Sequence, residues 1–215
     1  TFAEELRDDA EPDSTAREDL DFVVRETLRC RQIVRDLLDF SRQTKPDRQR
    51  LRPESVLRQA LKLVEKQASF HDIVFRVHVE PNTPEVLADA NQLQQAILNL
   101  IINARDAMGG KGAIDCWVGV DEAGMVVLDV KDEGVGIPEE HWARVFEPFF
   151  TTKGAQGNGL GLAAVRSIVD QHAGRITVQS TMGKGTVFRV VLPAAGEGRR
   201  GSSTEEARKH EGSYS

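Results

Sequence analysis

The feature that most constrains the fold of this chain is a glycine-rich stretch from Asp132 to Leu162, which reads DEGVGIPEEHWARVFEPFFTTKGAQGNGLGL. Its glycines cluster at Gly134 and Gly136 and again at 157–161, on either side of an aromatic run and a Thr-Thr-Lys. Glycine lacks a Cβ, so it lets a backbone adopt positive φ and approach a phosphate or a flat base closely. We therefore interpret the stretch as a nucleotide site with a mobile cover.

The composition fits one globular core of ordinary size plus a smaller accessory element. The chain has 215 residues, 40% of them hydrophobic and 29% charged. The formal net charge of −6 argues against a nucleic-acid binder. The sequence has no run of about 18 apolar residues, so we expect no membrane contact by these residues. Cys30 and Cys116 fit a reducing compartment, so we expect a cytoplasmic location. The chain begins at Thr1 within a predicted helix, so we expect it to be part of a longer protein. That longer protein could carry a membrane anchor upstream.

Residues 1–45 are predicted to form the end of a helical hairpin. Phe2–Asp9 has the pattern of the last turns of one helix, and Thr15 with Glu18 forms a capping box that opens a second helix, running to about Gln43. Apolar or small residues recur along this second helix in a heptad seam: Leu20, Val23, Thr27, Cys30, Val34, Leu37 and Ser41. A hairpin cannot bury this stripe alone, so we expect a homodimer through a four-helix bundle; the alternative is one amphipathic helix lying on a domain.

Residues 46–193 are predicted to form an α+β domain, a two-layer α/β sandwich. Its mixed sheet would carry helices on one face and leave the other face partly for the nucleotide loops. Strands are expected at 49–51, 73–79, 86–88, 113–120, 125–131, 175–181 and 186–192, and helices at 53–70, 91–108 and 160–172. Lys45–Pro53 is the predicted linker, and residues 194–215, rich in Gly, Ser and charge, are a predicted disordered tail.

A row of amides marks the helix predicted at 91–108, for which Asp89 or Asn91 is the predicted cap. Gln95, Asn99 and Asn103 are spaced by four and share one face, while Leu98, Ile101 and Ile102 are expected to point inward. Amide oxygens can coordinate a hard cation without adding negative charge against a triphosphate. Solvated surface amides are the alternative.

Three further groups suit parts of a nucleotide. Asp132 ends a predicted strand, where its carboxylate can accept from an exocyclic amine such as N6 of adenine. Thr151, Thr152 and Lys153 supply hydroxyls and a cation for phosphate oxygens. The glycine-rich turn at 157–162 opens a helix, which presents free N–H groups to an anion.

Five motifs, in this order, resemble the ATP-binding domain of sensor histidine kinases of two-component systems. They are NLxxNA, DxGxGI, FxPFFTTK, GxGLGL and GxGTxF. The resemblance covers roughly 48–193, and the helix ending in LLDFSR is similar to the second helix of that family's dimerisation and phosphotransfer domain. The same superfamily includes gyrase, heat-shock chaperones and mismatch-repair ATPases.

The resemblance implies ATP and Mg²⁺ as cofactors and a response regulator receiver domain as partner. The γ-phosphate would pass to a His and then to an Asp of the regulator. Asn103 would bind Mg²⁺, Asn99 and Lys153 would be catalytic, and Asp132 would receive the adenine amino group, directly and through a water shared with Thr186. Residues 146–158 would form the ATP lid. The full set of implied ATP-binding residues is Asn99, Asn103, Asp106, Asp132, Gly134, Gly136, Ile137, Phe149, Thr151, Thr152, Lys153, Gly157, Gly159, Leu160, Gly161, Leu162 and Thr186.

Two departures from the family pattern stand out. Many members have a Lys three residues after the Mg²⁺ Asn, where this chain has Asp106, so Arg105 or Lys153 would have to meet the phosphate charge. The phosphoacceptor His with its acidic neighbour is also absent, because none of the five histidines fits: His71, His78, His141, His172 and His210. We expect the acceptor upstream of Thr1.

Two other functions remain open. One is an acceptor-less module that regulates a partner by ATP-dependent closure. The other is an ATPase of the gyrase B or mismatch-repair kind, which uses a Glu base four residues before the Mg²⁺ Asn; Asn99 occupies that place here and weakens this alternative.

Overall fold

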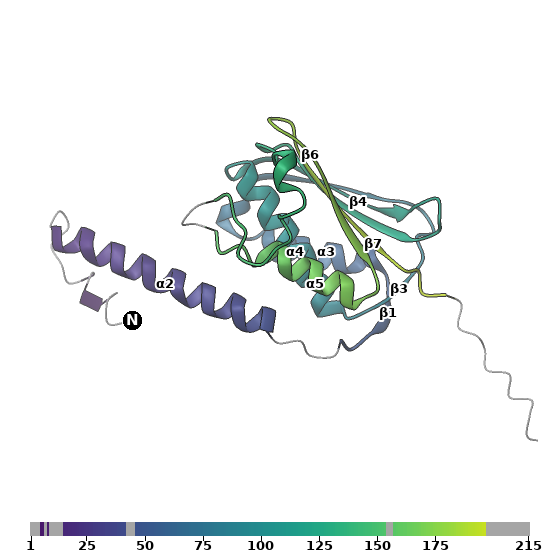
Figure 1. Cartoon of the computed structure of the whole chain (residues 1–215), viewed down its shortest axis with the longest axis horizontal. Helices are drawn as coiled ribbons and strands as arrows, with labels where there is room; N and C mark the ends of the chain where they lie inside the picture. The colour runs from purple at the N-terminus through teal and green to yellow at the C-terminus, as the bar shows by residue number, and fades with distance from the viewer. Residues whose placement is uncertain (1–4, 7, 9–14, 42–45, 154–156, 197–215) are drawn as a thin grey trace, which may run out of the picture.

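The computed structural model describes residues 5, 6, 8, 15–41, 46–153 and 157–196, which form a long helix and a sheet domain (Figure 1). Most of the predicted first helix and of the predicted tail lies outside these residues. At the start of that tail, Ala194 still pairs with Val86 in an isolated β-bridge. No helix in the described part of the chain has the length and apolar character needed to cross a bilayer.

Five strands form one mixed sheet in the order β2-β4-β5-β7-β6. β2 and β4 pair in parallel, and the other neighbours are antiparallel. The bounds are β2 Asp72–Val79, β4 Lys111–Val120, β5 Val126–Asp132, β6 Arg175–Thr181 and β7 Gly185–Leu192. β1 (Gln49–Leu51) and β3 (Val86–Ala88) form a separate antiparallel pair. The predicted mixed sheet is confirmed.

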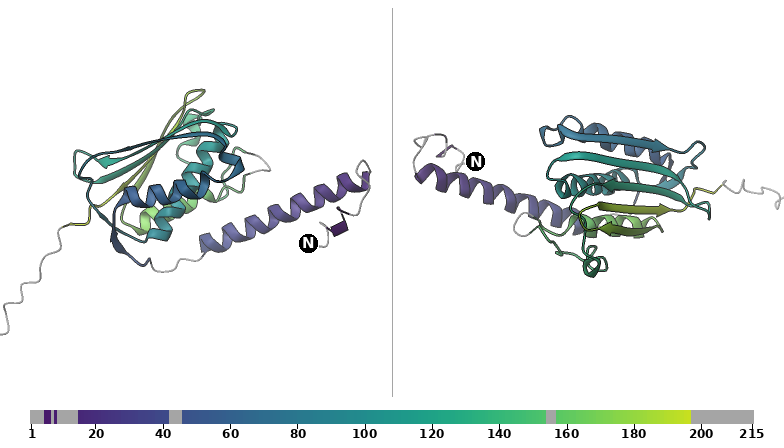
Figure 2. Two further views of the ribbon diagram at one scale, coloured as in Figure 1. Left: turned by 180° about the vertical axis from the view of Figure 1, so that it is seen from behind. Right: turned by 90° about the horizontal axis from the view of Figure 1, so that it is seen from above.

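Three helices cover one face of this sheet (Figure 2): α3 Pro53–Val64, α4 Ala90–Ala107 and α5 Gly161–Gln171. Short 3₁₀ turns, η1 Ala68–Phe70 and η2 Glu139–His141, lie outside these helices. The helix predicted at 53–70 ends early, at Val64, and continues as η1. No large apolar residue lies between Val64 and Phe70, so the stripe that packs α3 on the core stops there.

The core lies between these helices and the sheet, and strand alternation fills it. Ile114, Cys116 and Val118 of β4 are buried on the helix side, next to Val126, Leu128 and Val130 of β5. Their partners across the layer include Leu93, Ile97, Leu100 and Ile101 of α4. Burial, with a smaller contribution from Asp115, raises the pKa of the Cys116 thiol to about 12, so it packs as a neutral side chain.

The face of the sheet away from the helices carries charged pairs across neighbouring strands, and Figure 2 shows that no helix covers it. Arg189 of β7 donates two hydrogen bonds to Asp129 of β5, at 2.8 and 2.6 Å. Arg76 of β2 lies 3.5 Å from Asp115 of β4. Cross-strand pairs of opposite charge suit a solvated face.

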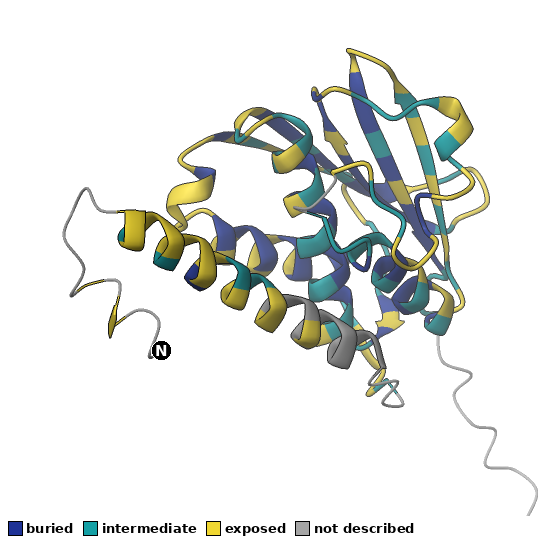
Figure 3. Cartoon of the chain, turned by 60° about the vertical axis from the view of Figure 1, so that its left-hand side comes forward, coloured by how far each residue is buried: buried dark blue, intermediate teal, exposed yellow. Residues whose placement is uncertain are grey.

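The long helix α2 spans Thr15–Ser41 and starts at the predicted capping residue. In the predicted seam, Val23, Thr27, Cys30 and Val34 are exposed, and Val24 beside them is buried. Figure 3 shows that most of the described surface of α2 is exposed. The seam is therefore an unpartnered stripe in this single chain, with the side chains of Leu37 and Ser41 outside the described set.

The end of the linker is attached where α4 begins. Asp89 caps α4, because its Oδ1 accepts from the backbone N–H groups of Asn91 at 2.9 Å and Gln92 at 3.1 Å. Its Oδ2 accepts from the N–H of Asp47 at 2.9 Å. Burial by itself would raise the pKa of Asp89, but these N–H donors and nearby His172 lower it below its ordinary value.

The last residues of α5 meet the same point. The N–H of Asp89 donates to Nε2 of the buried His172 at 2.9 Å, and the other ring nitrogen of His172 bonds to the carbonyl of Ile168 at 2.7 Å. Arg48 donates to the carbonyl of Gln171. Asp47, Arg48, Asp89 and His172 together form what we call the linker anchor.

Candidate nucleotide site

A cleft of about 730 Å³ lies between α4, the N-terminus of α5 and the loops that follow β5. This volume is within the range of small-molecule sites. Most of the residues predicted for the site line it: Asn99, Asn103, Asp106, Asp132, Gly136, Ile137, Thr151, Thr152, Lys153, Gly157, Gly159, Leu160, Gly161, Leu162 and Thr186. The predicted residues that line the cleft are separated by up to 87 positions in sequence, from Asn99 to Thr186.

Two predicted residues do not line the cleft. The side chain of Phe149 is 65% exposed, and its φ of 67° turns the chain at that point. Gly134 lies against the end of α4, where a Cβ would come within 2.6 Å of the Ala107 carbonyl oxygen. Gly134 therefore lets the loop pack against α4. Its role in the site is structural, because it does not line the cleft.

The cleft opens on the helix side of the sheet. Its walls include α4, α5 and the core residue Phe188, so the expectation that the nucleotide loops would use the other face was wrong. The inward orientation predicted for Ile102 was also wrong, because this side chain is 38% exposed and lines the cleft. Arg29 of α2 reaches the lining as well.

Asp132 marks the deep end of the cleft. The residue is 2% exposed, and its Oδ1 accepts from the N–H groups of Gly134 at 2.8 Å and Thr186 at 3.2 Å. No described residue donates to Oδ2. Burial raises the pKa of Asp132, although these two N–H donors act in the opposite direction. A buried carboxylate with one oxygen left over is suited to accept from a ligand.

Ser180 of β6 fixes the loop beside Asp132, and sequence reasoning missed it. Its Oγ accepts from the N–H of Ile137 at 2.8 Å, donates to the carbonyl of Gly185 at 2.9 Å and lies 2.9 Å from Oγ1 of Thr186. Gly136 is in contact with the next turn, since a Cβ there would be 2.4 Å from the Thr181 carbonyl oxygen. These contacts hold the DxGxGI loop against the β6–β7 turn.

The amide row of α4 faces the start of α5. Nδ2 of Asn99 donates to the carbonyl of Gly161 at 3.2 Å, which ties the two helices together. A Cβ on Gly161 would meet only Nδ2 of Asn103, at 3.8 Å, so there is open space beside this backbone. No described side chain caps α5, and its first N–H groups are available to an anion.

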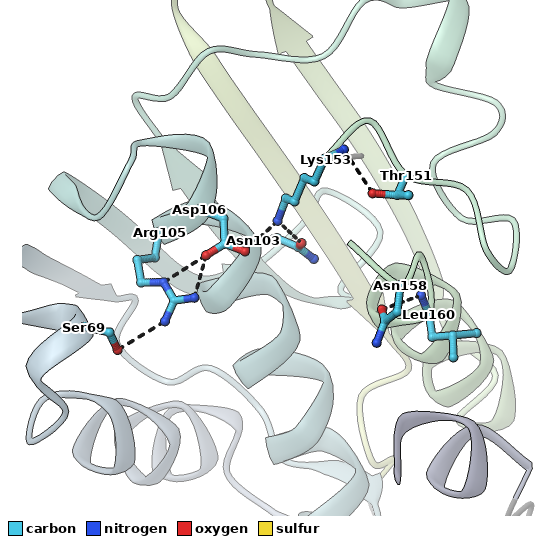
Figure 4. A network of polar contacts seen from close by, with 8 residues as sticks. All are labelled: Ser69, Asn103, Arg105, Asp106, Thr151, Lys153, Asn158 and Leu160. Carbon is cyan, nitrogen blue, oxygen red and sulfur yellow. Dashed lines mark hydrogen bonds and ion pairs between the residues drawn. The ribbon is translucent and has the colours of Figure 1, made fainter. Parts of the chain in front are cut away.

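Lys153 links the loop before α5 to α4 (Figure 4). Its Nζ donates to Oδ2 of Asp106 at 2.7 Å and to Oδ1 of Asn103 at 3.1 Å. Arg105 binds Oδ1 of the same carboxylate through Nε at 3.0 Å and Nη2 at 2.5 Å. Burial alone would raise the pKa of Asp106, but Lys153 and Arg105 lower it below its ordinary value, so the carboxylate is ionised.

Arg105 is directed away from the cleft. Its Nη1 donates to Oγ of Ser69 at 3.2 Å, and its guanidinium lies 4.9 Å from the centre of the Phe70 ring. Figure 4 shows it on the far side of Asp106 from Asn103. Of the two cations considered for the phosphate charge, Lys153 is the one that lines the cleft.

The segment before α5 is closed at its base. The N–H of Phe149 donates to the carbonyl of Gly159 at 3.0 Å, and Gly159 has a φ of 67°. A Cβ on Gly159 would lie 2.3 Å from the Phe149 carbonyl carbon, so only glycine fits there. The N–H of Leu160 donates to Oδ1 of Asn158 at 3.1 Å (Figure 4).

Sequence reasoning also missed apolar lining residues, namely Val135, Val145, Ala164 and Phe188. Phe150, which belongs to the predicted lid, lines the cleft as well. Phe150 is held from outside by the Arg144 guanidinium, 4.6 Å from its ring centre. The period-2 pattern of β7 could have placed Phe188 on the helix side. The irregular segment around Val145 and Phe150 offers no such periodicity.

Comparison with known proteins agrees with this geometry. Residues 88–196 match the model of the family described as histidine kinase-, DNA gyrase B- and HSP90-like ATPases. The sensor histidine kinase ZraS of Escherichia coli (strain K12) is 37% identical over 171 residues, which are 80% of this chain and 36% of ZraS. The chain thus spans little more than a third of that relative's length.

Two solved structures share the fold. The crystal structure of full-length ShkA in complex with AMPPNP superposes with a TM-score of 0.72 at 26% identity, over 90% of this chain and 42% of ShkA. The histidine kinase ThkA, in complex with the response regulator TrrA, has a TM-score of 0.71 at 26% identity, over 90% of this chain and 55% of ThkA. From its five motifs, its mixed sheet and its match over 88–196, the chain belongs to the family of histidine kinase-, DNA gyrase B- and HSP90-like ATPases.

Proposed function

We propose that this chain binds ATP with Mg²⁺ and acts as the catalytic part of a sensor histidine kinase. The γ-phosphate would be transferred to a His in the helical domain and then to an Asp of a response regulator. The observation that carries the proposal is the layout of the cleft. A buried carboxylate with a free oxygen lies at one end, and an uncapped helix N-terminus beside Asn103 and Lys153 lies at the other.

The adenine end fits a purine with an exocyclic amine. Oδ2 of Asp132 has no donor among the described residues, and the N6 amino group of adenine would supply one. Gly136 and Ile137 line the cleft with Asp132, and Ile137 adds an apolar surface there. Thr186, 3% exposed and beside Asp132, is placed to share a water with that amine, as the family resemblance implies.

The phosphate end fits an anion with a divalent metal. The free N–H groups at the start of α5 and the Lys153 ammonium would bind phosphate oxygens. In the described part of the chain no group of three or more His, Cys, Asp or Glu side chains could hold a metal. Mg²⁺ would therefore be held by Asn103 together with phosphate oxygens and water, which is the coordination Mg²⁺ prefers. Such a metal neutralises phosphate charge during phosphoryl transfer.

The position of Asn99 argues against the gyrase-like alternative. A hydrolase of that kind needs a carboxylate base four residues before the metal Asn, and Asn99 here is a neutral amide that donates to Gly161. An amide cannot take a proton from water. Without a base for water, the site fits transfer of the phosphate to an acceptor side chain from another domain.

Two observations support the proposed partners. The exposed seam on α2, with Val23, Cys30 and Val34, supports a homodimer through the helical hairpin. ThkA, whose structure is similar, was solved with a response regulator, which supports a receiver domain as the second partner.

Two experiments test the function. Calorimetry on the 215-residue chain should show MgATP binding that is tighter than MgITP binding, because ITP carries an oxygen in place of the N6 amine. The chain should also label the His of a separately expressed phosphotransfer domain from a sensor histidine kinase when given γ-labelled ATP. A chain that fails to bind MgATP refutes the nucleotide site. Binding without label, in a pairing that another catalytic domain does label, refutes the kinase role.

A further inference from the structure

Asp106 stands where a negative charge should be unfavourable for a triphosphate, and yet its side chain lines the cleft. Its two oxygens are divided between two cations. Oδ1 is bound by Arg105 and Oδ2 by Lys153. The carboxylate is therefore already neutralised by side chains of the protein.

Arg105 makes Asp106 a rigid support. The guanidinium is held by Ser69, packs on the Phe70 ring and binds Oδ1 through two nitrogens. Both N–H donors converge on Oδ1, so they hold that oxygen on the side of Arg105. Oδ2 is left for Lys153, which binds it on the other side of the carboxylate (Figure 4).

Lys153 depends on this support for its position. It has a flexible four-carbon stem and stands in an irregular segment, so the backbone alone does not fix its ammonium. Its described side-chain partners are Asp106, at 2.7 Å, and Asn103, at 3.1 Å. The two contacts place the positive charge beside the amide that faces the start of α5.

We propose that Asp106 is a positioning residue for Lys153: it holds the ammonium beside Asn103, so that the cation for the terminal phosphate comes from the loop before α5. This inference rests on the proposed function, because it takes ATP as the ligand. Asp106 itself makes no contact with the nucleotide. Because Oδ1 of Asn103 would be needed to hold Mg²⁺, Asp106 would be the side chain that keeps Nζ within reach of the phosphates in the loaded site.

The alternative is an ordinary surface ion pair. The Lys153 and Asp106 side chains are 36% and 32% exposed, and pairs with such exposure are coupled by no more than about five-fold in an equilibrium constant. An ion pair of that kind would also leave nucleotide binding unchanged. A double-mutant cycle read out on the nucleotide distinguishes the two.

The cycle uses Asp106→Asn, Lys153→Met and the double variant, with the Kd of MgATP measured by calorimetry. In the Lys153→Met background, Asp106→Asn removes a negative charge and should tighten MgATP binding. With Lys153 present, the same change also releases the ammonium, so the gain should be smaller or reversed. We expect the two Kd ratios to differ by on the order of ten-fold, and to differ less for MgADP, which has no γ-phosphate.

Three controls make the cycle specific. Asp106→Glu should restore most of the coupling, which a loss of fold would not allow. Asp129→Asn, in the pair with Arg189 on the other face of the sheet, should show no coupling to Lys153→Met. Unfolding in urea should give cooperative transitions for every variant.

A second measurement needs no nucleotide. Competitive acetylation with acetic anhydride, followed by peptide mass spectrometry, should modify Lys153 several-fold faster in Asp106→Asn than in the wild type. The exposed Lys184, in the β6–β7 turn, should react at the same rate in both.

The outcomes separate the two proposals. If the wild type binds MgATP and the two Kd ratios agree within about two-fold, the positioning role of Asp106 is wrong and the nucleotide site stands. Unchanged acetylation of Lys153 in Asp106→Asn overturns the role as well. If the wild type fails to bind MgATP, the proposed function fails and the positioning role fails with it.

Discussion

Replacing Asp132 with Asn should change which base the cleft prefers. Asparagine keeps the shape of the side chain, and its Oδ1 can still accept from the N–H groups of Gly134 and Thr186. The atom that faces the ligand changes from an acceptor oxygen to a donor NH₂. The N6 amine of adenine would then meet another donor.

The magnitude follows from the burial of the site. Asp132 is 2% exposed, so water cannot replace the lost contact. A hydrogen bond to a charged group contributes about 1.5–3 kcal/mol. Because about 1.4 kcal/mol corresponds to ten-fold in Kd, MgATP binding should weaken by roughly ten- to a hundred-fold. MgITP, whose base carries an acceptor oxygen at that position, should lose little or gain.

The same variant should alter the pH dependence of stability. Burial raises the pKa of Asp132 above its ordinary value of 3.8, so folding disfavours the ionised form. The stability contributed by this group is complete below the ordinary pKa and is lost as pH rises through the folded-state pKa. Asparagine does not ionise, so Asp132→Asn should gain stability relative to the wild type as pH rises from about 4 to 7, as urea unfolding would measure.

Calorimetry with MgATP and MgITP is the assay for the base preference. Asp129→Asn is the matched control, because it lies on the same strand, three positions earlier, and its partner is Arg189 on the opposite face. The control should bind MgATP like the wild type. An unchanged ratio of MgATP to MgITP affinity in Asp132→Asn would refute the adenine assignment.

Three further predictions concern other parts of the molecule. Asn103→Ala should abolish the Mg²⁺ dependence of ATP binding in calorimetry, and retained dependence would contradict the metal assignment. The melting temperature should stay within a few degrees, since this half-buried side chain is bonded only to Lys153 among the described residues. Gly136→Ala should lower the free energy of unfolding by about 2 kcal/mol more than Gly183→Ala; both glycines have positive φ, but only at Gly136 does the new methyl meet a backbone oxygen, at 2.4 Å, and equal losses would show that φ alone decides. Asp89→Ala should lower the free energy of unfolding by about 1 kcal/mol at pH 7 through loss of the helix cap. Because the pKa of Asp89 is lowered in the folded state, this loss should shrink as pH falls below 3.8. A loss that does not change with pH would show that the negative charge of Asp89 does not contribute.

The parts of the fold that sequence could predict are those with a local or periodic signal. The bounds of β4 and β7 depend on patterns among neighbouring residues, and they lie within two residues of the predicted 113–120 and 186–192. Asp132 and Asn103 could be predicted as site residues because their motifs occur in the order found in one family of ATP-binding domains. Neither motif alone would have predicted a shared cavity. Their placement in one cleft agrees with that prediction, and their roles remain proposals.

Other features depend on contacts between distant segments and leave no local trace. Phe149 turns outward because its backbone pairs with Gly159 and takes a positive φ. Ser180 matters because the strand order brings it to Ile137, 43 residues earlier. Ile102 looks like a core residue by its chemistry, but its position on α4 faces the cleft and not the sheet. Such outcomes follow from tertiary packing, which overrides the preference of a single residue.

The linker anchor connects the linker to both helices that line the phosphate end of the cleft. It bonds to the start of α4 and to the end of α5, which are the helix ends far from the cleft. Asn103 lies 14 residues beyond Asp89 (103 − 89 = 14), about 21 Å along the helix. If α4 is rigid, a tilt of about 5° at the anchor moves Asn103 by about 2 Å, close to the length of a bond between Mg²⁺ and oxygen. A small rotation of the linker would therefore shift the proposed metal ligand Asn103 by about the length of one bond between Mg²⁺ and oxygen.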